Sequence, residues 1–96
     1  MSTSIENLSH FSVSACSDPN SLSRVLELFA LNSLTPLRVN ARQVGETLLI
    51  DLTLAGLDDG RARLLHAKLD ALVPVESARL EQEVRLRPVV LEQRCA

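Results

Sequence analysis

The sequence predicts an α+β sandwich, in which a four-stranded antiparallel sheet carries two helices on one face, in the ferredoxin-like βαββαβ order. Three observations support this prediction. Four segments alternate apolar and polar residues, as half-buried strands do. Two further segments repeat apolar residues at helical spacing, and short polar turns separate the six segments. Because every predicted strand is amphipathic, we expect the second face of the sheet to be polar or to meet a partner.

The first strand and helix are predicted over residues 11–32. Residues 11–16 alternate with the period of a strand. Asp18 is expected to cap the following helix and Pro19 to be its first residue. We expect Asn32 to end the helix in the left-handed conformation. The apolar stripe of this helix consists of Leu22, Val25, Leu26, Phe29 and Ala30.

A hairpin is predicted next, because residues 37–42 and 48–54 both alternate around the turn at 44–46. Thr35 and Pro36 precede it, and a proline at this point fits a strand at the edge of the sheet. The predicted turn consists of Val44, Gly45 and Glu46.

The second helix is expected to begin at a cap formed by Asp58 or Asp59 and to stop before Pro74. Its apolar face is Ala62, Leu65, Leu69 and Leu72. A long final strand is predicted from Ala78 to Arg87. Together the segments predict a core of Val13, Val25, Leu26, Phe29, Val39, Ile50, Leu52, Leu65, Leu69 and Leu80.

Length and composition limit the possible functions. Ninety-six residues with 46% hydrophobic content fit a single domain. A net charge of −2, scattered basic residues and only 2% aromatic residues argue against nucleic acid as a partner. The sequence contains neither a secretory signal nor a run of about 18 apolar residues, so we expect no membrane contact and a cytoplasmic location. Cys16 and Cys95 lie far apart, which indicates neither a disulfide framework nor a zinc site.

We expect the domain to occupy residues 10–87, after a flexible leader at 1–9 and before a C-terminal tail at 88–96. The tail contains Val89, Val90 and Leu91, and a solvated tail seldom holds three such residues together. We therefore expect them to pack on a neighbouring chain.

The turn between the first strand and the first helix is the best candidate for a ligand site. Unpaired backbone amides at a helix start attract anions, so we expect the amides of residues 20–22 and two nearby hydroxyls to hold a carboxylate. Asp18 is expected to accept an ammonium group. The expected ligand-binding residues are Ser17, Asp18, Asn20, Ser21 and Leu22.

Nothing in the sequence indicates catalysis, a metal or a cofactor. His10 and His66 are isolated from each other and from acidic partners at ligand spacing. Asp58 and Asp59 are explained by helix capping and by the helix dipole. We therefore expect that the chain is not an enzyme.

Surplus leucines predict an interface with another chain. Leu28, Leu31 and Leu34 exceed what one small core is expected to bury. Arg24 and Arg38 are expected to point toward the same edge, where a second domain would lie. The expected interface residues are Arg24, Leu28, Leu31, Pro36 and Arg38. The expected partner is a second copy of the chain or a larger catalytic subunit.

Over residues 10–82 the chain resembles the ACT domain family. The resemblance rests on Asp18-Pro19, the following Leu22 and Arg24-Val25-Leu26, the Thr35-Pro36 strand entry and the segment Leu69-Asp70-Ala71-Leu72-Val73. It implies a regulatory module that binds an amino acid where paired domains meet. ACT domains that respond to ligands usually have glycine after this proline, whereas this chain has Asn20.

Within that family the chain looks most similar to the small regulatory subunits of acetolactate synthase. The similarity lies in the run Pro19, Ser21, Leu22, Arg24, Val25 and Leu26. This resemblance implies a non-catalytic regulatory subunit in branched-chain amino acid biosynthesis. The alternative is a structural protein–protein interaction module that has lost ligand binding.

Overall fold

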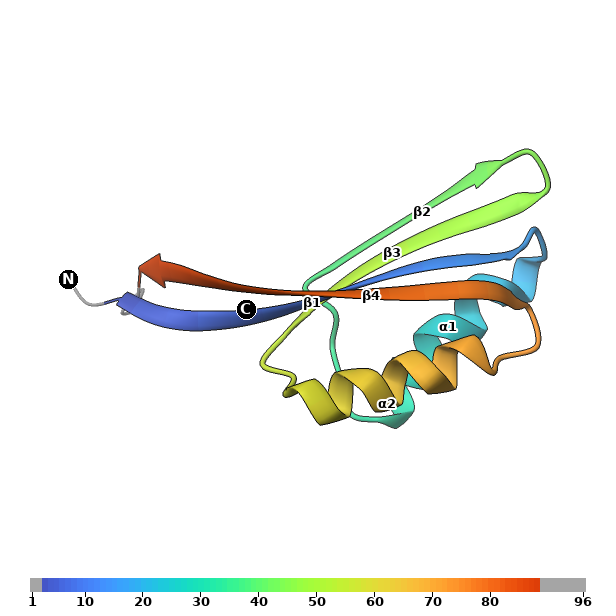
Figure 1. The fold of residues 1–96 in the computed structure, drawn as a ribbon. Helices are drawn as coiled ribbons and strands as arrows, with labels where there is room; N and C mark the ends of the chain where they lie inside the picture. The colour runs from blue at the N-terminus through green and yellow to red at the C-terminus, as the bar shows by residue number, and fades with distance from the viewer. Residues whose placement is uncertain (1–2, 89–96) are drawn as a thin grey trace, which may run out of the picture.

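The structure, a computed structural model, describes residues 3–88. All of its strands join one antiparallel sheet in the order β2-β3-β1-β4 (Figure 1). The predicted fold class is confirmed. The elements in chain order are β1 (Thr3–Cys16), α1 (Pro19–Leu31), β2 (Arg38–Val44), β3 (Thr47–Ala55), α2 (Asp59–Asp70) and β4 (Val75–Pro88).

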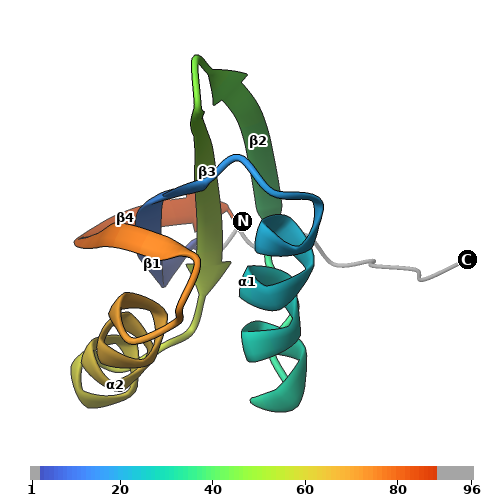
Figure 2. The ribbon, with the colours of Figure 1, turned by 90° about the vertical axis from the view of Figure 1, so that its right-hand side faces the viewer.

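Both helices lie on one face of the sheet, and the other face is open (Figure 2). The core lies between the sheet and the helices because the apolar sides of β1, β3, α1 and α2 meet there. Phe11 and Phe29 meet in it edge to face, with ring centroids 5.5 Å apart. The buried residues of this core cluster are Phe11, Val13, Ala15, Val25, Phe29, Ile50, Leu52, Leu54, Leu57, Ala62, Leu65, Leu69 and Val75.

Three residues of the predicted core are not fully buried. Leu26 and Leu80 are half-buried against the core cluster, and Val39 is 42% exposed. Every residue of β2 is exposed, because β2 is the edge strand and the β2–β3 hairpin rises away from both helices (Figures 1 and 2). The edge position predicted from Pro36 is thus confirmed, whereas the expected burial of Val39 is wrong.

The expected leader is wrong for the residues that the structure describes. β1 begins at Thr3, and residues 3–7 pair with residues 84–88 of β4 beyond the end of β3. We call these ten paired residues the arm; it projects past the helices on the left of Figure 1. The rest of the predicted tail, residues 89–96 with Cys95, lies outside the described residues.

The helix starts agree with the predictions, and one helix end does not. Asp18 caps α1 through a 2.8 Å bond from the Asn20 amide, and Asp58, rather than Asp59, caps α2. Asn32 has φ −96°, and the left-handed residue is Ser33, with φ 59°. The Ser33 amide donates to the Ala30 carbonyl. The Leu34 amide donates to the Phe29 carbonyl, and the two bonds together form the Schellman motif.

Candidate functional site

The loop between β1 and α1 is held at the end of the sheet by two other connections. The Cys16 amide donates to the Pro74 carbonyl at 2.9 Å, which joins the loop to the α2–β4 connection. The Ser17 amide donates to the Glu46 carbonyl at 3.2 Å, which joins it to the β2–β3 turn. Three chain reversals therefore converge around the start of α1.

The donors expected to hold a carboxylate are partly used inside the loop. The Asn20 amide bonds to the Asp18 carboxylate, and the Ser21 amide bonds to the Asp18 carbonyl at 3.0 Å. Ser21 is buried, and its hydroxyl donates to the Cys16 carbonyl at 2.8 Å. The expectation that these amides and this hydroxyl face a ligand is wrong, because capping and loop closure use them first.

Two open hollows flank the loop. The first lies between the start of α1 and the β2–β3 hairpin and has a volume of about 410 Å³. The second lies toward the α2–β4 connection and has a volume of about 320 Å³. Both volumes fall at the lower end of the range for small-molecule pockets. The first is lined by Ser17, Asp18, Pro19, Leu22, Gln43 and Leu48, and the second by Asp18, Asn20, Ser21, Arg24, Val73 and Pro74.

The predicted ligand residues are thus distributed between the two hollows on either side of the start of α1. Ser17 and Leu22 line the first hollow, Asn20 and Ser21 line the second, and Asp18 borders both. The lining of the first hollow combines apolar side chains with a few polar groups, which is the usual composition of a small-molecule site. We name it the helix-start hollow.

Sequence reasoning missed two residues of the helix-start hollow. Gln43 of β2 and Leu48 of β3 are paired across the hairpin, and both line the hollow. Gln43 follows Val39 and Ala41 in the alternation of β2, so it puts an amide where the pattern calls for an apolar residue. This polar residue at an apolar position was the feature of the sequence that could have indicated a site at Gln43.

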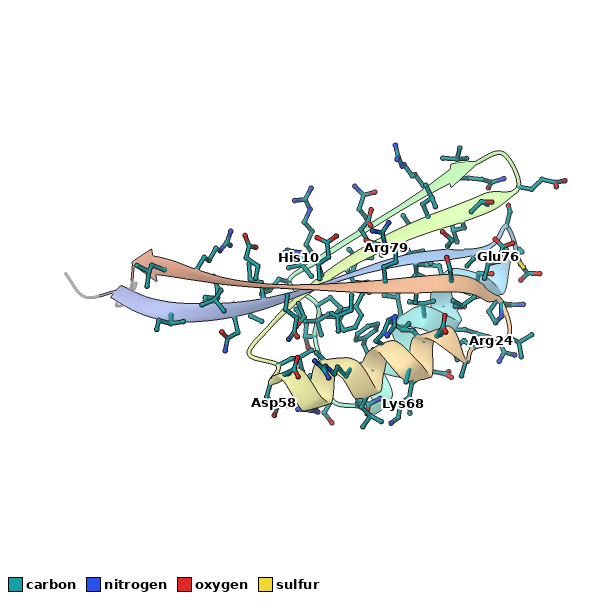
Figure 3. The ribbon with its side chains drawn as sticks, in the orientation of Figure 1. His10, Arg24, Asp58, Lys68, Glu76 and Arg79 are labelled. Carbon is teal, nitrogen blue, oxygen red and sulfur yellow. The ribbon has the colours of Figure 1, made fainter. Side chains whose placement is uncertain are left out.

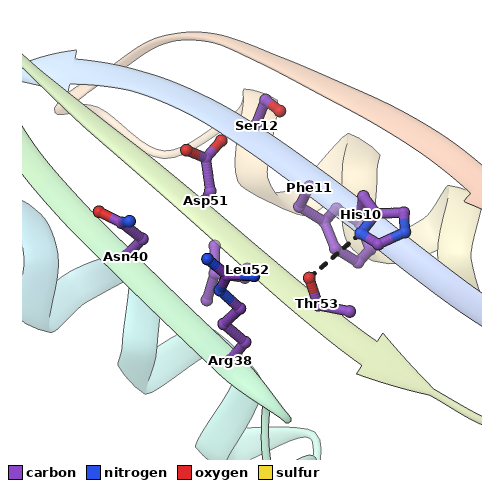
Figure 4. Close-up of a pocket in the computed structure, with 8 residues that line it drawn as sticks. All are labelled: His10, Phe11, Ser12, Arg38, Asn40, Asp51, Leu52 and Thr53. Carbon is purple, nitrogen blue, oxygen red and sulfur yellow. Dashed lines mark hydrogen bonds between the residues drawn. The ribbon is translucent and has the colours of Figure 1, made fainter.

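The predicted interface residues do not form one surface. Arg24 lies beside the loop in the second hollow, near the α2–β4 connection, whereas Arg38 lines a third hollow on the open face of the sheet (Figures 3 and 4). The expectation that the two arginines point to the same edge is wrong, because their elements carry them to different sides of the sheet. Pro36 is half-buried.

Two of the three leucines that were expected to exceed the core contribute to it. Leu28 and Leu34 are half-buried and pack against the core, whereas Leu31 is 76% exposed. Leu34 reaches the core because the Schellman turn brings the chain back toward the helix. Only Leu31 therefore keeps the apolar surface from which an interface was predicted.

The third hollow is a polar site that the sequence did not indicate. The His10 imidazole bonds through Nδ1 to the Thr53 hydroxyl at 3.1 Å and through Nε2 to the Glu83 carboxylate at 2.9 Å. Because a carboxylate only accepts, Nε2 carries the proton, and in the neutral ring the Thr53 hydroxyl donates to Nδ1. Sheet pairing creates this contact between residues that are far apart in the chain, so spacing in the sequence could not reveal it.

Other reactive groups in the described part of the chain do not gather. Cys16 is a free and exposed thiol. His66 reaches the Ala78 carbonyl through Nε2 at 2.7 Å, which fastens α2 to β4. Within residues 3–88, no three side chains of the histidine, cysteine, aspartate and glutamate types come together as metal ligands. No helix in the same range combines the length and the apolar character needed to cross a membrane.

A comparison with protein families decides the classification. A family model described as an ACT-like domain matches residues 2–87. The chain belongs to the ACT-like domain family. ACT domains are regulatory, ligand-binding modules, and the fold described above is theirs. The sequence matches no curated protein.

Solved structures share the fold at low sequence identity. The ACT domain from GTP pyrophosphokinase of Chlorobium tepidum, solved by NMR, has a TM-score of 0.70 and 8% identity, over 79% of this chain and 86% of that one. The C-terminal domain of the MgtC protein from Mycobacterium tuberculosis has a TM-score of 0.65 and 14% identity, over 80% and 87%. The regulatory subunit of aspartate kinase from Thermus thermophilus, in its ligand-free form, has a TM-score of 0.61 and 13% identity, over 93% and 62%.

Proposed function

We propose that this ACT-like domain is a non-catalytic regulatory subunit that binds a free amino acid in the helix-start hollow. The observation that carries the proposal is the composition of that hollow. Ser17, Asp18 and Gln43 are its polar lining residues, and Leu22 and Leu48 are apolar ones. These groups match the charged head and the side chain of an apolar amino acid.

The chemistry assigns a role to each group. The Asp18 carboxylate uses Oδ1 for the helix cap, and its second oxygen is available for an ammonium group. The Ser17 hydroxyl can donate to a carboxylate. Gln43 uses one amide hydrogen for the Gly45 carbonyl, at 3.2 Å, and has a second for the ligand. Leu22 and Leu48 favour an aliphatic ligand such as valine, leucine or isoleucine, since burial of each methylene contributes about 0.8 kcal/mol.

The regulated protein follows from the sequence resemblance. The likeness of residues 19–26 to small regulatory subunits of acetolactate synthase supports an enzyme of branched-chain amino acid biosynthesis as the partner. Regulation requires that the ligand bind one state of the complex more tightly than the other, because only differential affinity shifts an equilibrium. The proposed cellular location is the cytoplasm.

A second chain is expected to complete the hollow, which is open on one side. The adjoining strand β2 is fully exposed along its length, and its outer edge has backbone groups available for pairing. We propose a homodimer, or a complex with a larger catalytic subunit, that uses β2 and the outer side of α1. Leu31 is the exposed apolar residue of α1 that this surface would contain.

Thermal unfolding with each standard amino acid tests the proposal. A ligand at a hundred times its Kd stabilises the folded state by about 2.7 kcal/mol, which raises the Tm of a domain of this size by about 10 °C or more. We expect such a rise with valine, leucine or isoleucine. Gln43→Leu should reduce it, whereas Gln82→Leu, an exposed position on β4, should preserve it. A Tm that no amino acid raises would favour the alternative, an interaction module without ligand binding.

A further inference from the structure

The open face of the sheet carries two rows of polar side chains. Strand pairing places Arg38, Thr53 and His10 side by side in one row. The next row along the strands contains Asn40, Asp51 and Ser12. On β4 the two rows continue to Glu81 and Arg79, which do not line the hollow. Because side chains two residues apart share a face, both rows point away from the helices. Together they border a hollow of about 310 Å³, shown in Figure 4.

Two opposite charges border this hollow without meeting. Arg38 and Asp51 are diagonal neighbours on adjacent strands, a relation that puts residues about 7–8 Å apart. Within residues 3–88, neither side chain forms an ion pair or a side-chain hydrogen bond. Elsewhere in the same range, charges within reach do pair, as Arg63 does with Asp59 at 3.1 Å. The hollow therefore separates a cation from an anion by a space that a small molecule can enter.

The third side of the hollow is fixed. Hydrogen bonds on both ring nitrogens hold His10 between Thr53 of β3 and Glu83 of β4. The imidazole is therefore committed to these partners and serves as a wall. Of the residues that line the hollow, Arg38 and Asp51 are the charged groups available to a ligand, with the Asn40 amide beside Asp51 on the neighbouring strand.

We propose that this hollow binds a small zwitterion, namely a free α-amino acid. The Arg38 guanidinium takes the carboxylate, in the fork geometry that suits arginine, and the Asp51 carboxylate takes the ammonium. A simple anion would be repelled by Asp51 and a simple cation by Arg38, so the pair selects a ligand that carries both charges. The volume, at the lower end of the range for ligand pockets, limits the ligand to a small molecule.

This site is separate from the helix-start hollow and does not depend on it. The two hollows have no lining residue in common. A regulatory domain with two amino-acid sites can respond to ligand over a wider range of concentration than a domain with one. The experiment must therefore report which hollow is occupied.

NMR titration of the ¹⁵N-labelled chain with each standard amino acid gives that information. We expect at least one amino acid to shift the backbone amides of residues 10–12, 38–40 and 51–53. Its N-acetyl derivative, which lacks the ammonium, and its amide, which lacks the carboxylate, should leave these signals unmoved. Shifts confined to residues 17–22, 43 and 48 would support the helix-start hollow alone and overturn this proposal. Shifts confined to the open face would support this proposal and contradict the proposed function.

Matched variants test the two charges. Arg38→Gln and Asp51→Asn should each weaken binding at the open face by more than about tenfold, because each removes a charge-assisted contact. Arg42→Gln is the control, since Arg42 lies on the same strand and the same face, one row beyond the hollow. The spectra themselves show whether each variant is folded. Equal affinity in all three variants, or no shift of the open-face amides with any amino acid, would refute the site.

Discussion

Asp18 links the fold to the candidate site. Its carboxylate caps α1, its carbonyl accepts the Ser21 amide, and its side chain borders both hollows around the loop. The cap was predictable because capping depends on a few adjacent residues. The sequence did not predict that bonds within the loop occupy the amides of Asn20 and Ser21. Those bonds depend on how the loop closes, which includes the bond from the Ser21 hydroxyl to the Cys16 carbonyl.

Replacement of Asp18 by alanine is expected to lower the free energy of unfolding by about 1 kcal/mol, because the Asn20 amide loses its cap. Urea denaturation measures the change. Asp70→Ala is the matched control, since Asp70 lies at the C-terminal end of α2, where a negative charge opposes the helix dipole. Equal losses in the two variants would show that the cap contributes nothing specific.

Glycine in place of Ser33 is expected to raise the free energy of unfolding by about 0.5–1 kcal/mol, because Ser33 has φ 59° and glycine tolerates this region. Thermal unfolding tests it. Asn32→Gly should destabilise instead, since Asn32 has a negative φ and its side-chain Nδ2 donates to the Leu28 carbonyl at 2.7 Å. A loss of stability in Ser33→Gly would contradict the assigned helix end.

At the scale of elements, the periods of two and 3.6 residues located the helices and strands of the described chain, because apolar residues recur at the period of the element that carries them. The extent of β1 was missed, because residues 3–9 are mostly polar and read as a leader. Pairing with β4 nevertheless carries the strand outward. The exposure of β2 was missed because its alternation is that of a buried strand, whereas its edge position is set by the whole sheet.

In the arm β1 has a single partner strand, whereas in the body of the sheet it has two. β1 pairs with both β3 and β4 over residues 8–15, but only with β4 over residues 3–7. The arm also leaves Ile5, Val84 and Leu86 exposed, at 69%, 68% and 71%. We therefore expect it to be less stable than the rest of the sheet.

Amide hydrogen exchange tests this expectation. Amides of residues 3–7 and 84–87 should exchange much faster than those of residues 11–15, because alternate amides of the arm have no second strand to bond. Mass spectrometry or NMR can follow both segments in one sample. Equal protection would contradict the expectation and would show that another chain or segment covers the arm.

At the scale of the whole molecule, the described chain has a closed core on one side of its sheet and an unpaired edge at β2. The closed core was largely predictable, because Val13, Val25 and Phe29 follow from periodicity. The two hollows that carry the proposals could not be predicted from the sequence, because residues from several elements line each of them. The Arg38–Asp51 hollow, for example, exists only through the register of β2 against β3.

Self-association through β2 predicts that Val39→Lys weakens a dimer without unfolding the domain, because Val39 is exposed on that strand. Light scattering across a concentration series measures the dissociation constant, which we expect to rise by about tenfold or more. Leu64→Lys is the control, since Leu64 is exposed on α2, away from the proposed surface. A dissociation constant that Leu64→Lys raises and Val39→Lys does not would place the contact on α2 instead.

The central claim is that the helix-start hollow binds an aliphatic amino acid, and calorimetric titration of the chain with valine, leucine and isoleucine tests it most directly. We expect saturable heat with at least one of the three, and we expect Gln43→Leu to lower it to the heat of the open-face site alone, because Gln43 borders the helix-start hollow and not the open-face site. No heat with any of the three, or equal heat in the two proteins, would contradict the claim.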